Sequence, residues 1–179
     1  MRTIRIYVQF AALMMLFLVI ACTPTKFSTT LYKDTTYSRR PQRFLVINTY
    51  SIPETRRILE DTLVMGLKDR GIDAVVSYPV IPDLPVPDED VVKSLAKEAG
   101  ADTILIIRYV NRDIDDLGLG TSLYVTYINS QIDVYDMKSN KQVFSASAET
   151  RIKNGEPLVP QFETYVRNVI NMLSQEGLL

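Results

Sequence analysis

The stretch ADTILIIRYV, Ala101–Val110, contains four consecutive aliphatic residues, Ile104 to Ile107. An uninterrupted apolar run rich in β-branched residues is typical of a strand that is covered on both faces. We therefore expect this segment to be a buried central strand, and its neighbours along the chain to supply the helices that cover it.

A strand and a helix are predicted before this central strand. RFLVINTY, Arg43–Tyr50, is a compact run of β-formers, and the helix follows within residues 51–71. Ser51 and Glu54 have the spacing of a capping box, and Pro53 is tolerated in the first turn. Apolar residues recur at helical spacing up to Gly71, which is expected to end the helix.

A second such unit leads into the central strand. IDAVVSY, Ile72–Tyr78, is predicted as a strand, and the next segment contains Pro79, Pro82, Pro85 and Pro87, which exclude a helix interior or a central strand. Asp88 is expected to cap a helix over Glu89–Ala99, and Gly100 to end it.

The C-terminal half predicts a long hairpin and a closing helix. An acidic loop is expected at residues 111–122, followed by two alternating arms around KSNK, with a bulge or a second covered face near Ile128. The amphipathic tail from residue 157 closes the domain. The predicted class is α/β (α+β), a single mixed sheet of about five strands in the order β-α-β-α-β-β-β-α, with helices packed on the sheet.

The first residues have the pattern of an export signal. Arg2 and Arg5 precede the apolar run Ile6–Ala21, whose 16 residues fall short of the roughly 20 that span a bilayer. Residues 1–21 are therefore predicted to be a cleaved signal peptide. Its end, Val19-Ile20-Ala21-Cys22, resembles the bacterial lipobox, and the alternative is a free cysteine after an ordinary signal.

The lipobox resemblance implies cleavage between Ala21 and Cys22 and acylation of Cys22, the only cysteine. By Gram-negative sorting rules, Thr23 in place of aspartate implies the outer membrane. Several acyl chains would explain stable anchoring, which one chain alone does not provide. Residues 22–42, rich in Thr and Ser, are predicted to be a lipidated tether. If it is flexible, it places the domain about 25 Å from the lipid. Within it, KFSTTLYKD has the composition of a short edge strand. Residues 43–179 are predicted to form one domain.

Composition excludes several classes of function. With 20 basic and 21 acidic residues, the chain offers no electrostatic reason to bind nucleic acid. Because it has no histidine and a single cysteine, Ser-His and Cys-His catalysis and histidine or multi-thiolate zinc sites are excluded. We expect no cofactor and no metal, and we expect a protein that is not an enzyme.

Weaker chemical signals favour ordinary structural roles. Asp113, Asp115 and Asp116 offer oxygen ligands but lack the spacing of a calcium-binding EF-hand loop. LGLGTS lacks the lysine of a phosphate-binding loop. The S-x-x-K spacing of Ser94 and Lys97 lies on a predicted helix surface without its companion motifs. A carboxylate or Ser-Lys enzyme is therefore the least favoured alternative.

A recognition surface is predicted at tyrosines and prolines. Tyrosine combines contact area with a polar tip, and a proline-rich loop is stiff before binding. The candidate partner surface comprises Tyr78, Pro79, Pro82, Pro85, Pro87, Tyr124 and Tyr127, with Tyr135 near the same hairpin. Packing within the sheet is the alternative role of these tyrosines.

The motifs RRILEDTLVMGLKDRGIDAVVSY, LAKEAGADTILIIRY and DVYDMKSNKQVFSASAET, together with the lipobox, resemble a set of small bacterial lipoproteins. The broader architecture is similar to the TolB amino-terminal domain, the curli secretion lipoprotein CsgG and the penicillin-binding-protein activator LpoB. The resemblance implies a lipid-anchored periplasmic module, without catalysis, that binds an envelope protein or a peptidoglycan-associated component. The alternative is a subunit of a CsgG-like oligomeric complex, in which Leu123–Ile152 is the one hairpin long enough to consider for a pore.

Overall fold

The computed structural model describes residues 27–81, 88–116, 124–153 and 157–179. This part of the chain forms six strands and three helices. The strands are β1 (Ser28–Lys33), β2 (Arg43–Asn48), β3 (Asp73–Val76), β4 (Thr103–Asp116), β5 (Tyr124–Asp136) and β6 (Lys141–Lys153). The helices are α2 (Pro53–Lys68), α3 (Glu89–Glu98) and α4 (Leu158–Gln175).

One mixed sheet carries all six strands in the order β1-β6-β5-β4-β2-β3. β2 pairs in parallel with both β3 and β4, whereas the pairs β4–β5, β5–β6 and β1–β6 are antiparallel. The predicted α/β class and mixed sheet are confirmed, with six strands rather than about five. The sixth is β1, in which five of six residues are exposed, so it carries no strong hydrophobic signal.

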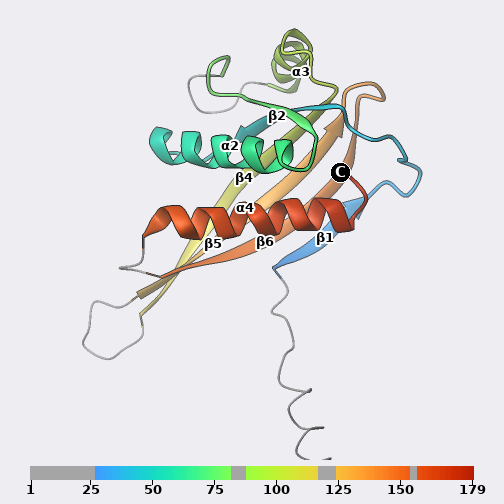
Figure 1. Cartoon of the computed structure of the whole chain (residues 1–179). Coiled ribbons are helices and arrows are strands. Elements are labelled where there is room, and N and C mark those ends of the chain that lie inside the picture. The colour runs from blue at the N-terminus through green and yellow to red at the C-terminus, as the bar shows by residue number, and fades with distance from the viewer. Residues whose placement is uncertain (1–26, 82–87, 117–123, 154–156) are drawn as a thin grey trace, which may run out of the picture.

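Helices cover the sheet unequally. α2 and α4 lie side by side on one face and start at the same end, while α3 lies on the opposite face (Figure 1). The central strand β4 is buried on both sides, as predicted, because Leu105 and Ile107 face α2 and α4 and Ile104 and Ile106 face α3. The strands β5 and β6 belong to this sheet, with Ile132, Val134 and Phe144 fully buried.

Two helix boundaries differ in detail from the prediction. Ser51 is not the N-cap of α2, because Ile52 occupies that position without a side-chain cap and Pro53 is the first helical residue. Proline suits this position, since its fixed φ is helical and its missing N–H would have no partner there. Asp88 is the N-cap of α3, but its side chain makes no capping hydrogen bond. Gly71 and Gly100, with φ of 75° and 68°, follow their helices as expected.

The prediction of an acidic loop at residues 111–122 is wrong for residues 111–116. β4 continues through Asp116 and pairs with β5 as far as Tyr124, so 111–116 are strand. Ladder pairing with a neighbouring strand overrides the weak β propensity of these residues. The irregularity predicted near Ile128 falls on the partner strand, where Val110 is an extra residue between Tyr109 and Asn111.

The strand β1 lies inside the segment 22–42 that was expected to be a tether. Ser28 is opposite Ala148 and Lys33 is opposite Phe144, so the sheet includes this part of the chain. Arg39 joins the same segment to the sheet by binding Asp136 at 2.7 Å and Asp102 at 3.0 Å.

Candidate functional site

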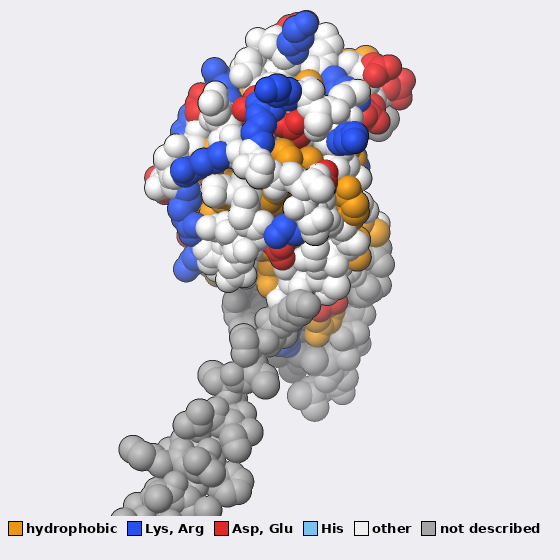
Figure 2. Space-filling model, turned by 90° about the vertical axis from the view of Figure 1, so that its right-hand side faces the viewer, with side chains coloured by type: hydrophobic (Ala, Val, Ile, Leu, Met, Phe, Trp, Pro, Cys, Tyr) orange, Lys and Arg blue, Asp and Glu red, His pale blue; other side chains and the backbone are white. Residues whose placement is uncertain are grey.

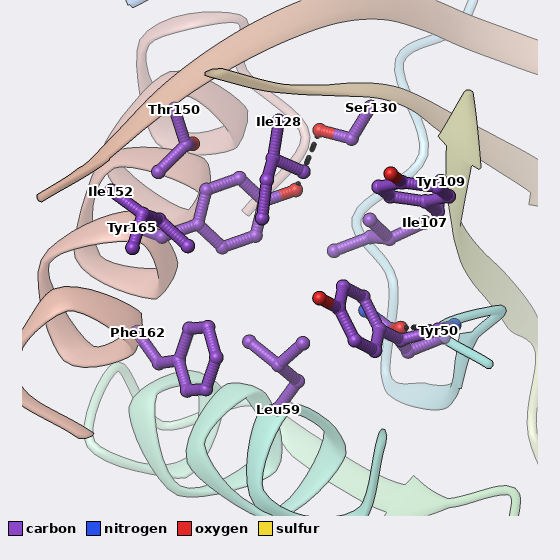
Figure 3. Close-up of a pocket in the computed structure, with 11 residues that line it drawn as sticks. Tyr50, Leu59, Ile107, Tyr109, Ile128, Ser130, Thr150, Ile152, Phe162 and Tyr165 are labelled. Atoms are coloured by element: carbon purple, nitrogen blue, oxygen red, sulfur yellow. Dashed lines mark hydrogen bonds between the residues drawn. The ribbon is translucent and has the colours of Figure 1, made fainter. Parts of the chain in front are cut away.

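A pocket lies between the sheet and the N-terminal halves of α2 and α4, beside the carboxyl ends of the parallel strand β2 and the adjoining part of β4 (Figure 3). The chain leaves β2 through α2 on one face and reaches β4 through α3 on the other. The carboxyl ends of such strands form a crevice where open α/β sheets commonly bind ligands. Topology therefore makes this pocket the first candidate site.

The lining of the pocket is uncharged. It combines aliphatic, aromatic and hydroxyl side chains from β4, β5, β6, α2 and α4 and from the end of β2: Asn48, Tyr50, Leu59, Ile107, Tyr109, Ile128, Ser130, Thr150, Ile152, Phe162 and Tyr165. The cavity itself is small, about 30 Å³. A site of this composition favours a neutral, largely apolar group over an ion.

Tyr165 brings a polar group to the inner wall. Its side chain comes from α4, and its hydroxyl lies 2.9 Å from Ser130 Oγ, as Figure 3 shows. Burial raises the pKa of Tyr165 to about 12, against a smaller opposing effect of the Ser130 hydrogen bond. The Thr150 hydroxyl, also in the lining, is buried without a hydrogen-bond partner. The pocket thus offers hydroxyl groups and no charge.

Tyr50 and Tyr109 form the wall nearest to the sheet end. Their rings meet edge to face, with centroids 5.5 Å apart. Local hydrogen bonds hold both backbones, because Tyr50 N donates to Asn48 Oδ1 at 2.8 Å and Tyr109 N donates to Thr49 Oγ1 at 3.0 Å. This wall is therefore positioned before any ligand arrives.

A buried ion pair supports α2 near the pocket. Glu60 is fully buried and accepts hydrogen bonds from Arg56 Nε at 2.9 Å and from the Asn48 N–H at 3.0 Å. It also accepts from the N–H and hydroxyl of Ser77 at 2.7 and 2.8 Å. These bonds join α2 to the ends of β2 and β3. Because both oxygens of Glu60 are occupied, the carboxylate serves structure rather than proton transfer.

A second polar cluster lies on the sheet face opposite α4. Asp133, with no exposed side-chain surface, pairs with Arg108 and accepts from Gln142 Nε2 at 2.8 Å and Gln131 Nε2 at 3.1 Å. A depression of about 110 Å³ adjoins Arg108 beneath α3. Among the described residues, no group of three or more acidic, cysteine or histidine side chains is arranged to hold a metal ion.

On the face drawn in Figure 2, the charged side chains of the described residues do not form a patch of one sign. Figure 2 shows Lys and Arg side chains scattered over the upper part of one face with Asp and Glu among them. The ordinary ion pairs include Lys33 with Glu176 at 3.1 Å and Arg43 with Asp73 at 3.3 Å. Such a surface on this face gives no field that would select a polyanion.

The predicted partner surface is divided between separate parts of the fold. Tyr78 and exposed Pro79 follow the edge strand β3, where the Tyr78 hydroxyl donates to Asp61 at 3.1 Å and the Arg57 guanidinium lies 5.6 Å from the ring centroid. The bond to Asp61 is the main reason that the pKa of Tyr78 is raised. Tyr124 and Tyr127 are in β5, three strands away. The structure does not bring the two groups together.

Several predicted residues lie outside the described part of the chain. They are the signal and lipidation residues Ala21, Cys22 and Thr23, the prolines Pro82, Pro85 and Pro87, and the sequence LGLGTS. Ser94 and Lys97 are both exposed on α3, as expected for helix surface. The backbone of Asp113, Asp115 and Asp116 belongs to β4.

Sequence reasoning did not identify the pocket. Phe162 and Tyr165 lie in the amphipathic tail predicted from residue 157, and Tyr50 and Tyr109 lie in two predicted strands, but the sequence assigns none of the four a functional role. The available signal was positional, because Tyr50 and Tyr109 each lie at the C-terminal end of a predicted strand, and the C-terminal ends of parallel strands meet at one edge of a sheet.

Solved structures share this fold at low sequence identity. The PelC dodecamer from Paraburkholderia phytofirmans matches in two crystal forms, with TM-scores of 0.54 and 0.52 and identities of 12% and 13%. These matches cover 83% and 80% of this chain and 98% and 94% of PelC. The lipoprotein GNA1162 from Neisseria meningitidis matches with a TM-score of 0.50 and 18% identity, over 75% of this chain and 99% of that protein.

The likeness establishes the fold, and the lipoprotein GNA1162 is one of the proteins that adopt it. No protein-family model matches the chain, and no curated protein is significantly similar in sequence. Within the described ranges, no helix combines the length and the apolar character required to cross a membrane.

Proposed function

We propose that the chain is a lipid-anchored, non-catalytic module of the bacterial envelope that binds another envelope component, a protein or a peptidoglycan-associated molecule. The observation that carries this proposal is the uncharged pocket at the carboxyl ends of the parallel strands. It offers apolar contact and hydroxyl groups, whereas the buried carboxylates Glu60 and Asp133 are occupied by structural partners. Binding is the function that such a site supports.

Anchoring is inferred from the N-terminal sequence. Cleavage between Ala21 and Cys22 would leave Cys22 to carry acyl chains, and Thr23 directs our proposal to the periplasmic face of the outer membrane. The fold likeness to the lipoprotein GNA1162 supports this proposal. No cofactor is required for it.

Membrane fractionation of wild type against Cys22→Ala tests the anchor. We expect wild type in the membrane fraction with incorporation of radioactive palmitate, and the variant without label and released from membranes. Unchanged attachment of the unlabelled variant would contradict the lipid anchor. Thr25→Ala serves as a matched control, because it alters a residue near the cleavage site without removing the thiol.

The binding role is tested by closing the pocket. Thr150→Leu adds apolar volume at the lining, and we expect it to weaken recovery of partners from solubilised envelopes at an unchanged melting temperature. Lys138→Ala, in the exposed β5–β6 turn, should leave recovery unchanged. Purified protein that turns over a substrate and recovers no partner would contradict the proposal; loss of turnover in Lys97→Ala would then favour the Ser-Lys enzyme.

A second candidate is a subunit of an oligomeric outer-membrane export or assembly complex of the CsgG type. The two PelC structures of similar fold are dodecamers, which supports this possibility. Size measurement in mild detergent distinguishes the two candidates. A ring would run far above the 20.3 kDa of one chain, and a single binding module would not.

A further inference from the structure

The strand β6 is longer than the strand that pairs with its outer side. β6 ends at Lys153, whereas β1 begins at Ser28, which lies opposite Ala148. One more hydrogen bond, from Glu149 N to the carbonyl of Phe27 at 3.2 Å, completes this ladder in the described part of the chain. On its other side, β6 stays paired with β5 as far as Lys153. Among the described residues, β6 is therefore an edge strand beyond Glu149.

The backbone of this edge faces outward. In an antiparallel ladder, the N–H and C=O of one residue point to the same side, and alternate residues point to opposite sides. Glu149 directs its N–H toward β1. Arg151 and Lys153 follow in the same regular stretch of the ladder, at alternate positions, so their N–H and C=O groups face the same side as those of Glu149. These groups form a template for an added strand.

A groove of about 330 Å³ adjoins this edge. It lies between β6, which contributes Thr150 and Arg151, and α4, which packs over the sheet (Figure 1). The lining residues of α4 share one face of the helix, because they recur at spacings of three and four: Gln161, Thr164, Tyr165 and Asn168. The wall that α4 supplies thus carries amide and hydroxyl groups and no charge.

The groove opens onto the candidate pocket. Thr150 and Tyr165 line both spaces. The Tyr165 hydroxyl lies 2.9 Å from Ser130 Oγ, whereas the Thr150 hydroxyl is buried and has no hydrogen-bond partner among the described residues. Directly opposite residues of paired strands share a face of the sheet. A residue added opposite Thr150 would therefore direct its side chain toward α4 and the pocket.

We propose that an extended segment of a protein partner adds to the sheet along Arg151–Lys153 and places a small apolar side chain in the adjoining pocket. This inference deepens the proposed binding role and rests on it. It assigns a polypeptide as the partner and strand addition as the mode of binding. In this mode, main-chain hydrogen bonds supply affinity and pockets for alternate side chains supply specificity.

Two substitutions block the groove in different ways. Arg151→Pro removes an outward N–H that does not pair with β5, so the β5–β6 ladder keeps its hydrogen bonds. Arg151→Ala is its matched control, because it removes the side chain and retains the N–H. Thr164→Trp fills the groove from an exposed position of α4. Arg167→Trp, exposed on the same helix but outside the groove lining, is the control for added bulk.

The probe is a set of short linear peptides selected from a random phage library against the full mature protein in mild detergent. We expect bound peptides to protect the amides of Arg151 and Lys153 from hydrogen exchange. N-methylation of alternate peptide nitrogens should abolish binding, and methylation of the intervening nitrogens should be tolerated. Thr164→Trp and Arg151→Pro should each raise the peptide Kd at least about tenfold at an unchanged melting temperature, and both controls should match wild type.

Three results would overturn the inference. The first is a selection that yields no peptide, and the second is binding that Thr164→Trp leaves unchanged. The third is protection of the Arg151 and Lys153 amides before any peptide is added, since residues that precede Phe27 would then occupy the edge.

The proposed function has a separate readout in the recovery of partners from solubilised envelopes. Thr164→Trp should weaken this recovery as Thr150→Leu does. Weaker recovery with Thr150→Leu but normal recovery with Thr164→Trp would mean that the pocket binds its partner without strand addition. That outcome overturns the inference and leaves the proposed function in place.

Discussion

At the residue scale, Tyr165 connects the candidate site to the start of the folded chain. The ring of Phe27 packs edge to face against the ring of Tyr165, and the Tyr165 hydroxyl forms a hydrogen bond with Ser130 Oγ in the pocket. A buried phenol is stable in this position only while it is protonated, because burial disfavours the charged form. The residue therefore makes the packing of α4 on the sheet sensitive to high pH.

We predict that Tyr165→Phe removes the tyrosine ionisation step that occurs at the highest pH. The measurement is a pH titration followed by absorbance near 295 nm. The pKa of Tyr165 is about 12 in the folded protein against 10.0 for the ordinary group. Because the folded pKa is raised, the associated stability is present below pH 10 and is lost between pH 10 and 12. That loss, about 2–3 kcal/mol, should be absent in the variant.

The exposed Tyr32 provides the control for this titration. Tyr32→Phe should leave the latest ionisation step and the alkaline loss of stability in place. An identical titration of wild type and Tyr165→Phe up to the pH of unfolding would show that the hydroxyl is accessible to solvent, and would contradict its burial in the pocket.

At the element scale, the contact between α2 and α4 depends on one glycine. A Cβ added to Gly66 would overlap Cδ1 of Ile170 and lie 3.8 Å from Val166. The absence of a side chain lets the two helices approach closely over the sheet. The same two helices supply Leu59 and Phe162, each from its N-terminal half, to the pocket.

We predict that Gly66→Val lowers the free energy of unfolding by about 1–3 kcal/mol through overpacking. Denaturant unfolding measures the effect. Met65→Val, at an exposed position of the same helix, is the control and should cost less than about 1 kcal/mol.

Ile170→Ala tests whether this contact is the cause. Combined with Gly66→Val, it should give a loss smaller than the sum of the two single losses, because the shortened side chain relieves the overlap. Additive losses would show that the two positions are not in contact and would contradict the close helix pair.

At the scale of the whole molecule, stability is expected to be unequal across the sheet. β1 has one strand neighbour and five exposed residues out of six, whereas β2 lies between two strands with five of its six residues buried. Local opening follows such differences in burial. The edge that leads to the proposed anchor is thus the part of the sheet most easily released.

We predict that backbone amides of β1 exchange with deuterium well before those of β2, as measured by mass spectrometry at neutral pH. Glu176→Gln removes the ion pair to Lys33 and should accelerate exchange in β1 while leaving β2 unchanged. Simultaneous exchange of the two strands would show that β1 opens only with the whole domain.

Local patterns in the sequence were sufficient to predict most of the strands and helices. The apolar run at Ile104–Ile107, the helical stripes and the glycines after two helices each report a local requirement of the backbone. The edge strand β1 was visible only as a possibility, because its residues are mostly exposed and hydrophobicity cannot identify such a strand. The extension of β4 through Asp116 depends on pairing with β5, which lies later in the chain.

The sequence by itself determined the fold class, the order of the elements and the proposed anchoring residue, because these follow from periodicity and local motifs. Only the tertiary structure decided which side chains share a site. Tyr50, Tyr109 and Tyr165 meet because a parallel crossover and a closing helix bring positions up to 115 residues apart to one edge of the sheet. Likewise, Phe27 lies near Glu149 through strand pairing, a long-range contact that no local pattern specifies.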